Sequence, residues 1–248
     1  MYSDDFQLRI LRNRHKAEAE TYRRATGCKI RQTQERYCRY LVLLSMNARC
    51  HRAESRFQSD SDSGKWPASI SEVPNILQRH FHAASPNQKW LTDLTEFALP
   101  AGKVYLSPVI DCFDGMVHSW TIGTSPNAQL VNNMLEKALA TLRPGERPII
   151  HSDRGCHYRW PDWIKRVDDA GLTRSMSRKG CSPDNSACEG FFGRLKNEMF
   201  YGRSWAGVSL DRFMEILDNY IRWYNEARIK LSLGGMSPLE FRRSLGLI

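Results

Sequence analysis

The sequence lacks the segments that mark a membrane or secreted protein. Its longest apolar run, residues 40–46, is far shorter than the roughly 18 residues that a membrane-spanning helix needs. The N-terminus also lacks the basic, apolar and small-residue order of a secretory signal. We therefore expect a soluble protein of the cytoplasm that has no membrane partner.

Cysteine is present, but without the pattern of a disulfide framework or a zinc site. The seven cysteines are an odd number, and none belongs to a Cys-x-x-Cys pair. A zinc site built on Cys50 and His51, or on His80 and His82, would lack the paired spacing of structural zinc sites. The cysteines therefore favour a reducing compartment and argue against structural zinc.

Positive charge is what the sequence has in excess. Among 248 residues, 36 Lys and Arg stand against 27 Asp and Glu, which leaves a formal net charge of +9. Such an excess favours a polyanionic partner, because neutralising its phosphates releases bound counterions. Charge alone does not separate DNA from RNA or from an anionic membrane surface.

The chain divides into a basic N-terminal segment, residues 1–72, and a larger region, residues 73–248. The run at 59–64 is rich in Ser and Asp and is typical of a linker near this boundary. The apolar periodicity before it is too weak to define a buried helix face. Two interpretations stay open for this segment: a poorly ordered basic arm, and a small helical DNA-binding module.

The first part of the larger region predicts three antiparallel strands. Residues 90–97 alternate apolar and polar side chains, and residues 104–112 and 116–123 are rich in strand-forming residues. An Asp-Gly pair at 114–115 is a favoured hairpin turn between the last two. Pro108 lies inside the second run and indicates an edge strand or a bulge.

Helices and strands then alternate. Ser125 followed by Pro126 predicts a helix start, and apolar residues recur after it at helical spacing. Short strands are predicted at 148–152 and 172–177, with a helix at 160–170 between them. The order predicts an α/β fold: a mixed five-stranded sheet, part antiparallel meander and part parallel, flanked by helices.

The last part of the chain predicts further helices. Asp184 is expected to cap a helix on which Glu189 and Lys196 share one face, at i and i+7. Because they share a face, we expect these two side chains to address one ligand. A longer helix is expected after Ser209, and a capping box that begins at Ser237 opens a last short helix.

Three acids lie on elements of this predicted core. Asp93 is in the first strand, Asp153 directly follows a strand, and Glu189 is near the start of a helix, with 35 residues between the last two acids. Carboxylate oxygens are ligands of Mg²⁺, and two such ions roughly 4 Å apart can clamp both oxygens of a phosphoryl transfer. We therefore predict that Asp93, Asp153 and Glu189 hold divalent metal ions against a phosphate backbone.

Each acid taken alone also has an ordinary explanation. An Asp at a strand end is often a turn former, and a Glu near a helix start often a partner of the helix dipole. Among the other acids, Glu96 faces away from Asp93 by strand alternation, and Asp114 belongs to its turn. Asp111 stays a weak candidate for the same site.

Histidine and basic residues accompany these acids. His151 and His157 flank the second acid, and without a paired nucleophile they are expected to have a structural or supporting role. Lys196, Arg178 and Lys179 are expected to neutralise phosphates of a bound strand. A solvated basic face is the alternative interpretation for each of these three cations.

Several motifs in order resemble one family over about residues 75–245. Together with the 35-residue gap between the second and third acids, they resemble the bacterial insertion-sequence transposases that have a retroviral-integrase-like catalytic core. The motifs are Thr92-Asp93-Leu-Thr-Glu-Phe97, His151-Ser-Asp153-Arg-Gly155, Ser175-Met-Ser-Arg-Lys-Gly180, Asp184-Asn185, Glu189-Gly-Phe-Phe-Gly-Arg-Leu-Lys196, and Tyr224-Asn225 through Arg228 to Ser237-Pro238.

The resemblance implies the fold and the chemistry of that family. It implies an RNase H-like fold, dependence on Mg²⁺ or Mn²⁺ with two ions when DNA is bound, and strand cleavage and strand transfer at the ends of an insertion sequence. Asp93, Asp153 and Glu189 would be its catalytic acids. We also expect a homo-oligomer assembled on element-end and target DNA in the nucleoid. The expected DNA contacts are Lys196, Arg178, Lys179, Arg154 and Asn185.

The N-terminal segment departs from the family. A helix-turn-helix region usually precedes the core, and many members act as a fusion with the product of an upstream reading frame, which we count as a further expected partner. Residues 1–70 do not resemble that region. We hypothesise that residues 28–63 are a degenerate or frame-shifted remnant of it.

Two alternatives to a transposase stay open. The first is an RNase H-like nuclease that cuts RNA or structured DNA without transferring ends. The second is an inactive DNA-binding relic that inhibits an intact transposase by mixed assembly.

Overall fold

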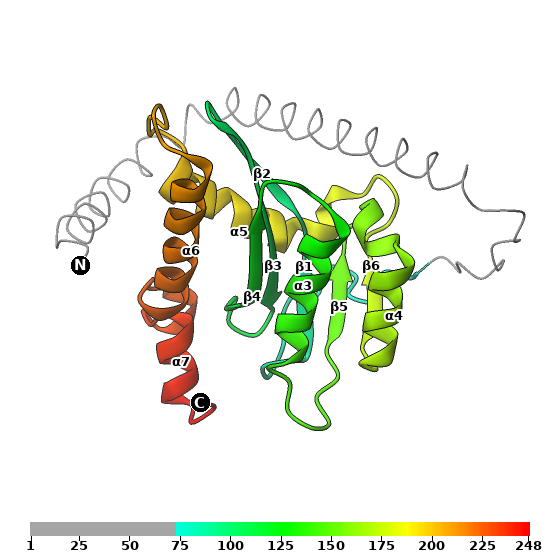
Figure 1. Ribbon diagram of the computed structural model, residues 1–248. Helices are drawn as coiled ribbons and strands as arrows, with labels where there is room; N and C mark the ends of the chain where they lie inside the picture. The colour runs from blue at the N-terminus through cyan, green and yellow to red at the C-terminus, as the bar shows by residue number, and fades with distance from the viewer. Residues whose placement is uncertain (1–72) are drawn as a thin grey trace, which may run out of the picture. The chain divides into compact units, whose positions relative to one another are not determined.

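The structure is a computed structural model, and it describes residues 73–248. The strands in this range are β1 (Lys89–Thr92), β2 (Thr95–Leu99), β3 (Gly102–Asp111), β4 (Val117–Gly123), β5 (Ile149–Ser152) and β6 (Thr173–Met176). They form one mixed sheet (Figure 1). β1, β2 and β4 each pair antiparallel with β3. β5 pairs in parallel with β1, and β6 pairs in parallel with β5. The predicted mixed α/β sheet is confirmed.

The strand predicted at 90–97 is divided into β1 and β2. Both pair with β3 in the same register, so they act as one long strand with a break. β1 ends at the pair of Thr92 with Val109, and the next residue, Asp93, falls opposite Pro108. Pro has no N–H to donate to a ladder. The break therefore lies where the neighbouring strand cannot supply a backbone donor, and it separates Asp93 from regular strand structure.

Pro108 itself lies in an interior strand. β3 pairs with β1 and β2 on one side and with β4 on the other, so the prediction of an edge strand at Pro108 is wrong. The alternative prediction, a bulge, is confirmed, because the register between β3 and β4 shifts between Val109 and Ile110. An interior strand tolerates the proline because the ladder on one side is already interrupted opposite it.

Helices cover both faces of the sheet (Figure 1). The helices are α3 (Ala128–Leu139), α4 (Pro161–Asp169), α5 (Ser186–Leu195), α6 (Leu210–Glu226) and α7 (Pro238–Ser244). Shorter turns are η1 (Cys156–Arg159), η2 (Ser182–Asn185), the π-helical turn η3 (Lys196–Phe200), which continues α5, and η4 (Leu231–Leu233). α3 and α4 pack on one face, and α5 and α6 on the other.

The starts of α3, α6 and α7 follow capping chemistry, with one correction among these three. Ser209 and Ser237 cap α6 and α7 as predicted, the latter with a complete capping box. α3 begins later than expected: Asn127, not Ser125, is its N-cap, and its Oδ1 accepts from Leu130 N at 2.9 Å. Asn and Ser cap equally well, so local sequence did not distinguish the two positions.

Consecutive residues of β1 point into two separate cores. Trp90 packs in the core beneath α3 and α4, whereas Leu91 packs in the core that α5 and α6 cover. This is the period of two that a strand imposes. Continuing the alternation to Asp93 directs that side chain to the face covered by α5.

The basic segment at 1–72 lies outside the described residues, and so do the predictions made for it. In the part of the chain that is described, every helix is too short or too polar to cross a membrane.

Candidate active site

Asp93 and Asp153 follow the C-terminal ends of two neighbouring parallel strands. β1 and β5 pair in parallel, and their last pair joins Leu91 to His151. Each Asp is two residues further along its strand, so the register brings the two acids side by side on the face that α5 covers. Two acids far apart in the sequence are thus neighbours because of one parallel pairing.

Glu189 and Asn185 connect α5 to this pair. Asn185, directly before α5, donates from Nδ2 to Oδ2 of Asp93 at 2.9 Å. Burial, then the charge of Asp153 and, to a smaller extent, that of Glu189 raise the pKa of Asp93 well above its usual value. Glu189 lies one helical turn beyond Asn185. Asp93 is therefore close enough to each of the other two acids to feel its charge.

Backbone N–H groups hold the two aspartates. Asp93 Oδ1 accepts from Leu94 N at 2.7 Å, and Asp153 Oδ1 accepts from Gly155 N at 2.8 Å. Burial raises the pKa of Asp153, and the bond from Gly155 opposes that rise. A Cβ atom at Gly155 would lie 2.8 Å from Asp153 Oδ1. A side chain at this position would therefore require the carboxylate of Asp153 to shift.

The donor set fits a hard divalent cation. Carboxylate oxygens are the ligands that Mg²⁺ and Mn²⁺ prefer, and a cation relieves the repulsion among clustered acids. Within residues 73–248, however, no three His, Cys, Asp or Glu side chains are already arranged as a metal-ligand group. Asp93 and Asp153 instead direct one oxygen each to a backbone N–H. The acids are gathered without forming a closed ligand shell.

Asp184 fixes the loop in front of α5. Its side chain is fully buried, and its carboxylate forms ion pairs with Arg178 at 2.9 Å and Arg79 at 2.8 Å. The hydrogen bond from Arg178 is the main reason that the pKa of Asp184 lies far below its usual value. The prediction that Asp184 caps the helix is wrong, since Asn185 occupies the N-cap position and Asp184 belongs to η2.

His151 ties this loop to β5. It is fully buried; its Nδ1 lies 2.8 Å from Ser175 Oγ and its Nε2 lies 3.0 Å from the carbonyl oxygen of Asp184. Burial lowers the pKa of His151, so the neutral ring is favoured. His157 is likewise buried, with Nε2 3.0 Å from the Pro126 carbonyl oxygen. Both histidines therefore hold backbone segments in place.

The residues predicted to contact DNA differ in the bonds that they already form within the protein. Lys196 donates to the carbonyl oxygen of Glu96 at 2.8 Å, and its ammonium lies 5.2 Å from the centre of the Phe97 ring. Arg154 donates from Nε to the carbonyl oxygen of Ser177 at 2.9 Å. Lys179 is exposed in the loop before η2. Their contact with DNA stays a prediction.

The other acids have structural partners. Glu96 accepts from the Tyr105 hydroxyl at 2.8 Å and pairs with Lys103. Asp111 and Asp114 are both buried against the guanidinium of Arg242 in α7. Asp111 therefore serves that ion-pair cluster, which sequence reasoning missed because nothing local to Asp111 indicates a partner so distant in the chain.

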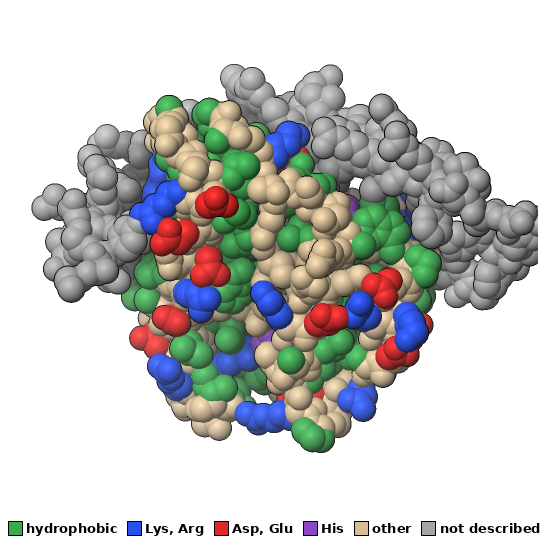
Figure 2. All heavy atoms as spheres, in the orientation of Figure 1, with side chains coloured by type: hydrophobic (Ala, Val, Ile, Leu, Met, Phe, Trp, Pro, Cys, Tyr) green, Lys and Arg blue, Asp and Glu red, His purple; other side chains and the backbone are tan. Residues whose placement is uncertain are grey.

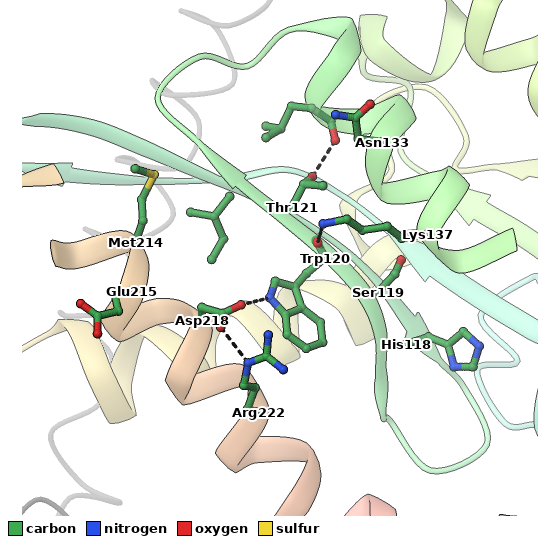
Figure 3. Close-up of a pocket in the computed structure, with 12 residues that line it drawn as sticks. His118, Ser119, Trp120, Thr121, Asn133, Lys137, Met214, Glu215, Asp218 and Arg222 are labelled. Carbon is green, nitrogen blue, oxygen red and sulfur yellow. Dashed lines mark hydrogen bonds and ion pairs between the residues drawn. The ribbon is translucent and has the colours of Figure 1, made fainter. Parts of the chain in front are cut away.

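One hollow of the described region lies away from the acids. It is a groove of about 730 Å³ between β4, α3 and α6 (Figure 3). Trp120 Nε1 donates to Asp218 at 2.8 Å, and Arg222 donates to the other oxygen of Asp218 at 2.8 Å. Asp93, whose neighbours define the candidate site, does not line it. Its lining combines apolar side chains with polar ones, some of which are paired with each other.

The molecular face that carries α3, α4 and α6 has mixed charge. Figure 2 shows blue and red side chains interspersed there rather than gathered by sign. Exposed pairs such as Lys165 with Asp169 contribute to this pattern. Mixed charge of this kind is typical of a solvated surface.

The fold and the sequence agree on an integrase core. Two family models described as integrase core domain match residues 83–182 and 189–245. Among solved structures, the simian T-cell lymphotropic virus intasome in complex with PP2A regulatory subunit B56 gamma is similar with a TM-score of 0.50 and 20% identity. That match covers 60% of this chain and 52% of the other. These findings define the RNase H-like fold of an integrase catalytic core.

Similar proteins of known family assign the chain to a narrower group within the integrase-core proteins. It is 66% identical over 176 residues to the probable transposase for insertion sequence element IS1353 of Shigella flexneri, covering 71% of this chain and 34% of that protein. It is 41% identical over 168 residues to a transposase-like protein of Haemophilus influenzae, covering 68% of this chain and 76% of that protein. The chain belongs to the bacterial insertion-sequence transposases with an integrase core domain. It spans about a third of the Shigella relative.

Proposed function

We propose that this chain acts as a transposase that cleaves DNA at the ends of an insertion sequence and transfers the strand ends into target DNA. The observation that carries the proposal is the gathering of Asp93, Asp153 and Glu189 around the ends of two parallel strands, with the pKa of Asp93 raised by both neighbours. Family membership supplies the reaction class, and the acids supply a site at which it can occur.

The catalytic acids of the proposal are Asp93, Asp153 and Glu189. Asp93, which the charges of both other acids reach, would hold two divalent ions, with Asp153 and Glu189 each holding one. Bound Mg²⁺ or Mn²⁺ supplies Lewis-acid activation of water or of a DNA 3′-hydroxyl and stabilises the leaving oxygen. The chain itself keeps the acids near each other through strand pairing and through Asn185.

DNA is the proposed substrate and partner. Lys196 lies on the extension of α5, seven residues beyond Glu189, and is proposed to contact a phosphate near the metal site together with Lys179 and Arg154. Arg178 and Asn185 complete the proposed contacts. We further propose assembly of several copies on DNA in the cytoplasm, at the nucleoid, with the product of an upstream reading frame as a further partner.

The test is strand transfer in vitro with labelled DNA that carries the element's terminal repeats. The wild-type chain should give Mg²⁺-dependent joined products. Asp153→Asn and Glu189→Gln should each abolish cleavage and joining while most non-specific DNA binding remains, because the metal ligands are lost and the basic surface is kept. Glu226→Gln, at an exposed position of α6, is the matched control and should be fully active.

The products separate the proposal from its alternatives. Hydrolysis without joining would indicate a nuclease, and binding without products would indicate an inactive relic. Full activity of Asp153→Asn or Glu189→Gln would remove that acid from the catalytic site.

A further inference from the structure

The side chain of Asn185 has two ends with different surroundings. It is only 4% exposed, and its Nδ2 donates to Asp93 at 2.9 Å. Its Oδ1 is buried and has no hydrogen-bond partner among the residues that the structure describes. A carboxylate oxygen only accepts, so the amide presents its NH₂ group to Asp93 and must direct its oxygen elsewhere.

An unpaired buried oxygen is costly. Leaving a buried acceptor without a donor costs about 1–3 kcal/mol, and a bound water or ion is one explanation for such an atom. The backbone directly before Asn185 is held in place, because Asp184 is bonded to Arg178, Arg79 and His151. The chain thus fixes an acceptor beside the carboxylate cluster.

A metal-bound water has the matching chemistry. Mg²⁺ keeps several of its waters when carboxylates hold it, and a bound water donates hydrogen bonds more readily than a free one. Partners in this outer shell orient the ligands and contribute to metal affinity. An amide can donate to a carboxylate ligand with one end and accept from a bound water with the other.

We propose that Asn185 is a positioning residue of the metal site, in which Nδ2 orients the carboxylate of Asp93 and Oδ1 accepts a hydrogen bond from a water bound to the divalent cation. This inference rests on the proposed function, since it assumes that Asp93 is a metal ligand. It assigns to Asn185 a role at the metal in addition to the DNA contact that the family resemblance implies.

The chain contains a matched control for this role. Asn132 of α3 is also buried, also donates from Nδ2 to an aspartate, Asp162 at 2.7 Å, and also has an Oδ1 without a partner within residues 73–248. Its aspartate belongs to α4 and not to the three acids. Replacing either Asn by Leu removes the same atoms from a similar environment, but only one of them lies at the candidate metal site.

The experiment is a titration of the full chain with Mn²⁺ in the absence of DNA. Free Mn²⁺ is measured by electron paramagnetic resonance, and the relaxation of water protons reports waters on the bound ion. Asn185→Leu should weaken Mn²⁺ binding by about tenfold and change the relaxation enhancement per bound ion, as loss of an outer-shell partner does. Asn132→Leu should bind Mn²⁺ like the wild type.

A second variant keeps the test informative if Asn185→Leu does not fold. Asn185→Ala removes the same two polar atoms without adding bulk, and it should also weaken Mn²⁺ binding by about tenfold. Mn²⁺ binding as tight as that of the wild type in folded Asn185→Ala would overturn the inference.

The outcomes distinguish this inference from the proposed function. If the wild type binds Mn²⁺, Asp153→Asn abolishes binding and Asn185→Leu binds like the wild type, the role of Asn185 is rejected and the metal site stands. If Asp153→Asn binds Mn²⁺ as tightly as the wild type, or the wild type does not bind it, the metal site itself is rejected and the role of Asn185 with it.

Discussion

Arg242 of α7 is buried against Asp114 of the turn between β3 and β4, with Nε 2.6 Å from Oδ2. A second nitrogen of the same guanidinium lies 2.9 Å from Asp111 Oδ2. One cation thus neutralises two buried acids and fixes the last helix to a turn of the sheet.

Removing this guanidinium should strongly destabilise the protein. Arg242→Met leaves two buried carboxylates without their counter-charge, and breaking a buried ion pair in this way costs about 3–5 kcal/mol. Urea unfolding of the full chain, followed by tryptophan fluorescence, measures the loss. Arg243→Met, the exposed neighbour in α7, is the control and should change little. A loss of under about 1 kcal/mol in Arg242→Met would show that the cluster is weakly coupled to folding.

Asp184 should make the stability of the folded protein depend on pH in the acid range. Its pKa is lowered in the folded protein, mainly by the hydrogen bond from Arg178, so its contribution is complete above the pKa of the unfolded chain, about 4 for Asp, and is lost as pH falls towards the folded value. Asp184→Asn should therefore be less stable than the wild type at pH 7, and the difference should shrink below pH about 4.

Urea midpoints at pH 7 and at pH 3 measure this difference. Asp169→Asn, which removes an exposed ion pair with Lys165, should leave the midpoint almost unchanged at both pH values. An Asp184→Asn deficit that is the same at both pH values would mean that shape, and not charge, is what Asp184 contributes.

Substitutions of Lys179 and Arg178 should differ in their effect on folding, although both residues are predicted to contact DNA. Lys179 is exposed, so Lys179→Ala should weaken DNA binding at low salt, reduce the slope of log affinity against log salt by about 1, and leave the unfolding midpoint unchanged. Arg178 is bonded to buried Asp184, so Arg178→Ala should lower the unfolding midpoint as well. A salt series of DNA binding by fluorescence anisotropy, with urea unfolding of the same samples, tests the pair. Unchanged stability of Arg178→Ala would contradict the role of the ion pair.

The cluster of acids should cost stability when no metal is bound. Burial and two like charges disfavour ionised Asp93, so Asp93→Asn should raise metal-free stability at pH 7 by about 1 kcal/mol. Saturating Mg²⁺ should reverse the order, because an ion at a hundred times its dissociation constant stabilises the wild type by about 2.7 kcal/mol and has no site in the variant. Thermal unfolding with and without Mg²⁺ measures both effects. Equal stabilisation of the two proteins by Mg²⁺ would place the ion elsewhere.

Much of the sheet could be predicted because its signals are local. Alternation marked the strand that contains Asp93, an apolar run marked β5 before Asp153, and Ser209 and Ser237 marked two helix starts. The neighbouring position of Asp93 and Asp153 then followed from a parallel pairing of two strands. These features depend on residues that are close in sequence or on a single pairing.

Contacts between distant segments could not be predicted. Arg242 has no pattern that links it to Asp111, and Arg79 has none that links it to Asp184, because an ion pair sets no sequence periodicity. For the same reason Asp184 was expected to be a helix cap: its local context is that of a cap, and its actual partners come from elsewhere. Of the two predictions for Pro108, an edge strand or a bulge, local sequence could not exclude the edge, because the break opposite Pro108 depends on another strand.

The close approach of Gly155 to Asp153 restricts how this sequence can drift. Every amino acid except glycine carries a Cβ atom, which would lie 2.8 Å from Asp153 Oδ1, so a substitution at this position requires the carboxylate to move. We expect copies of this sequence that remain active to encode glycine at position 155. Copies with another residue there should be inactive, even where all three acids are still encoded.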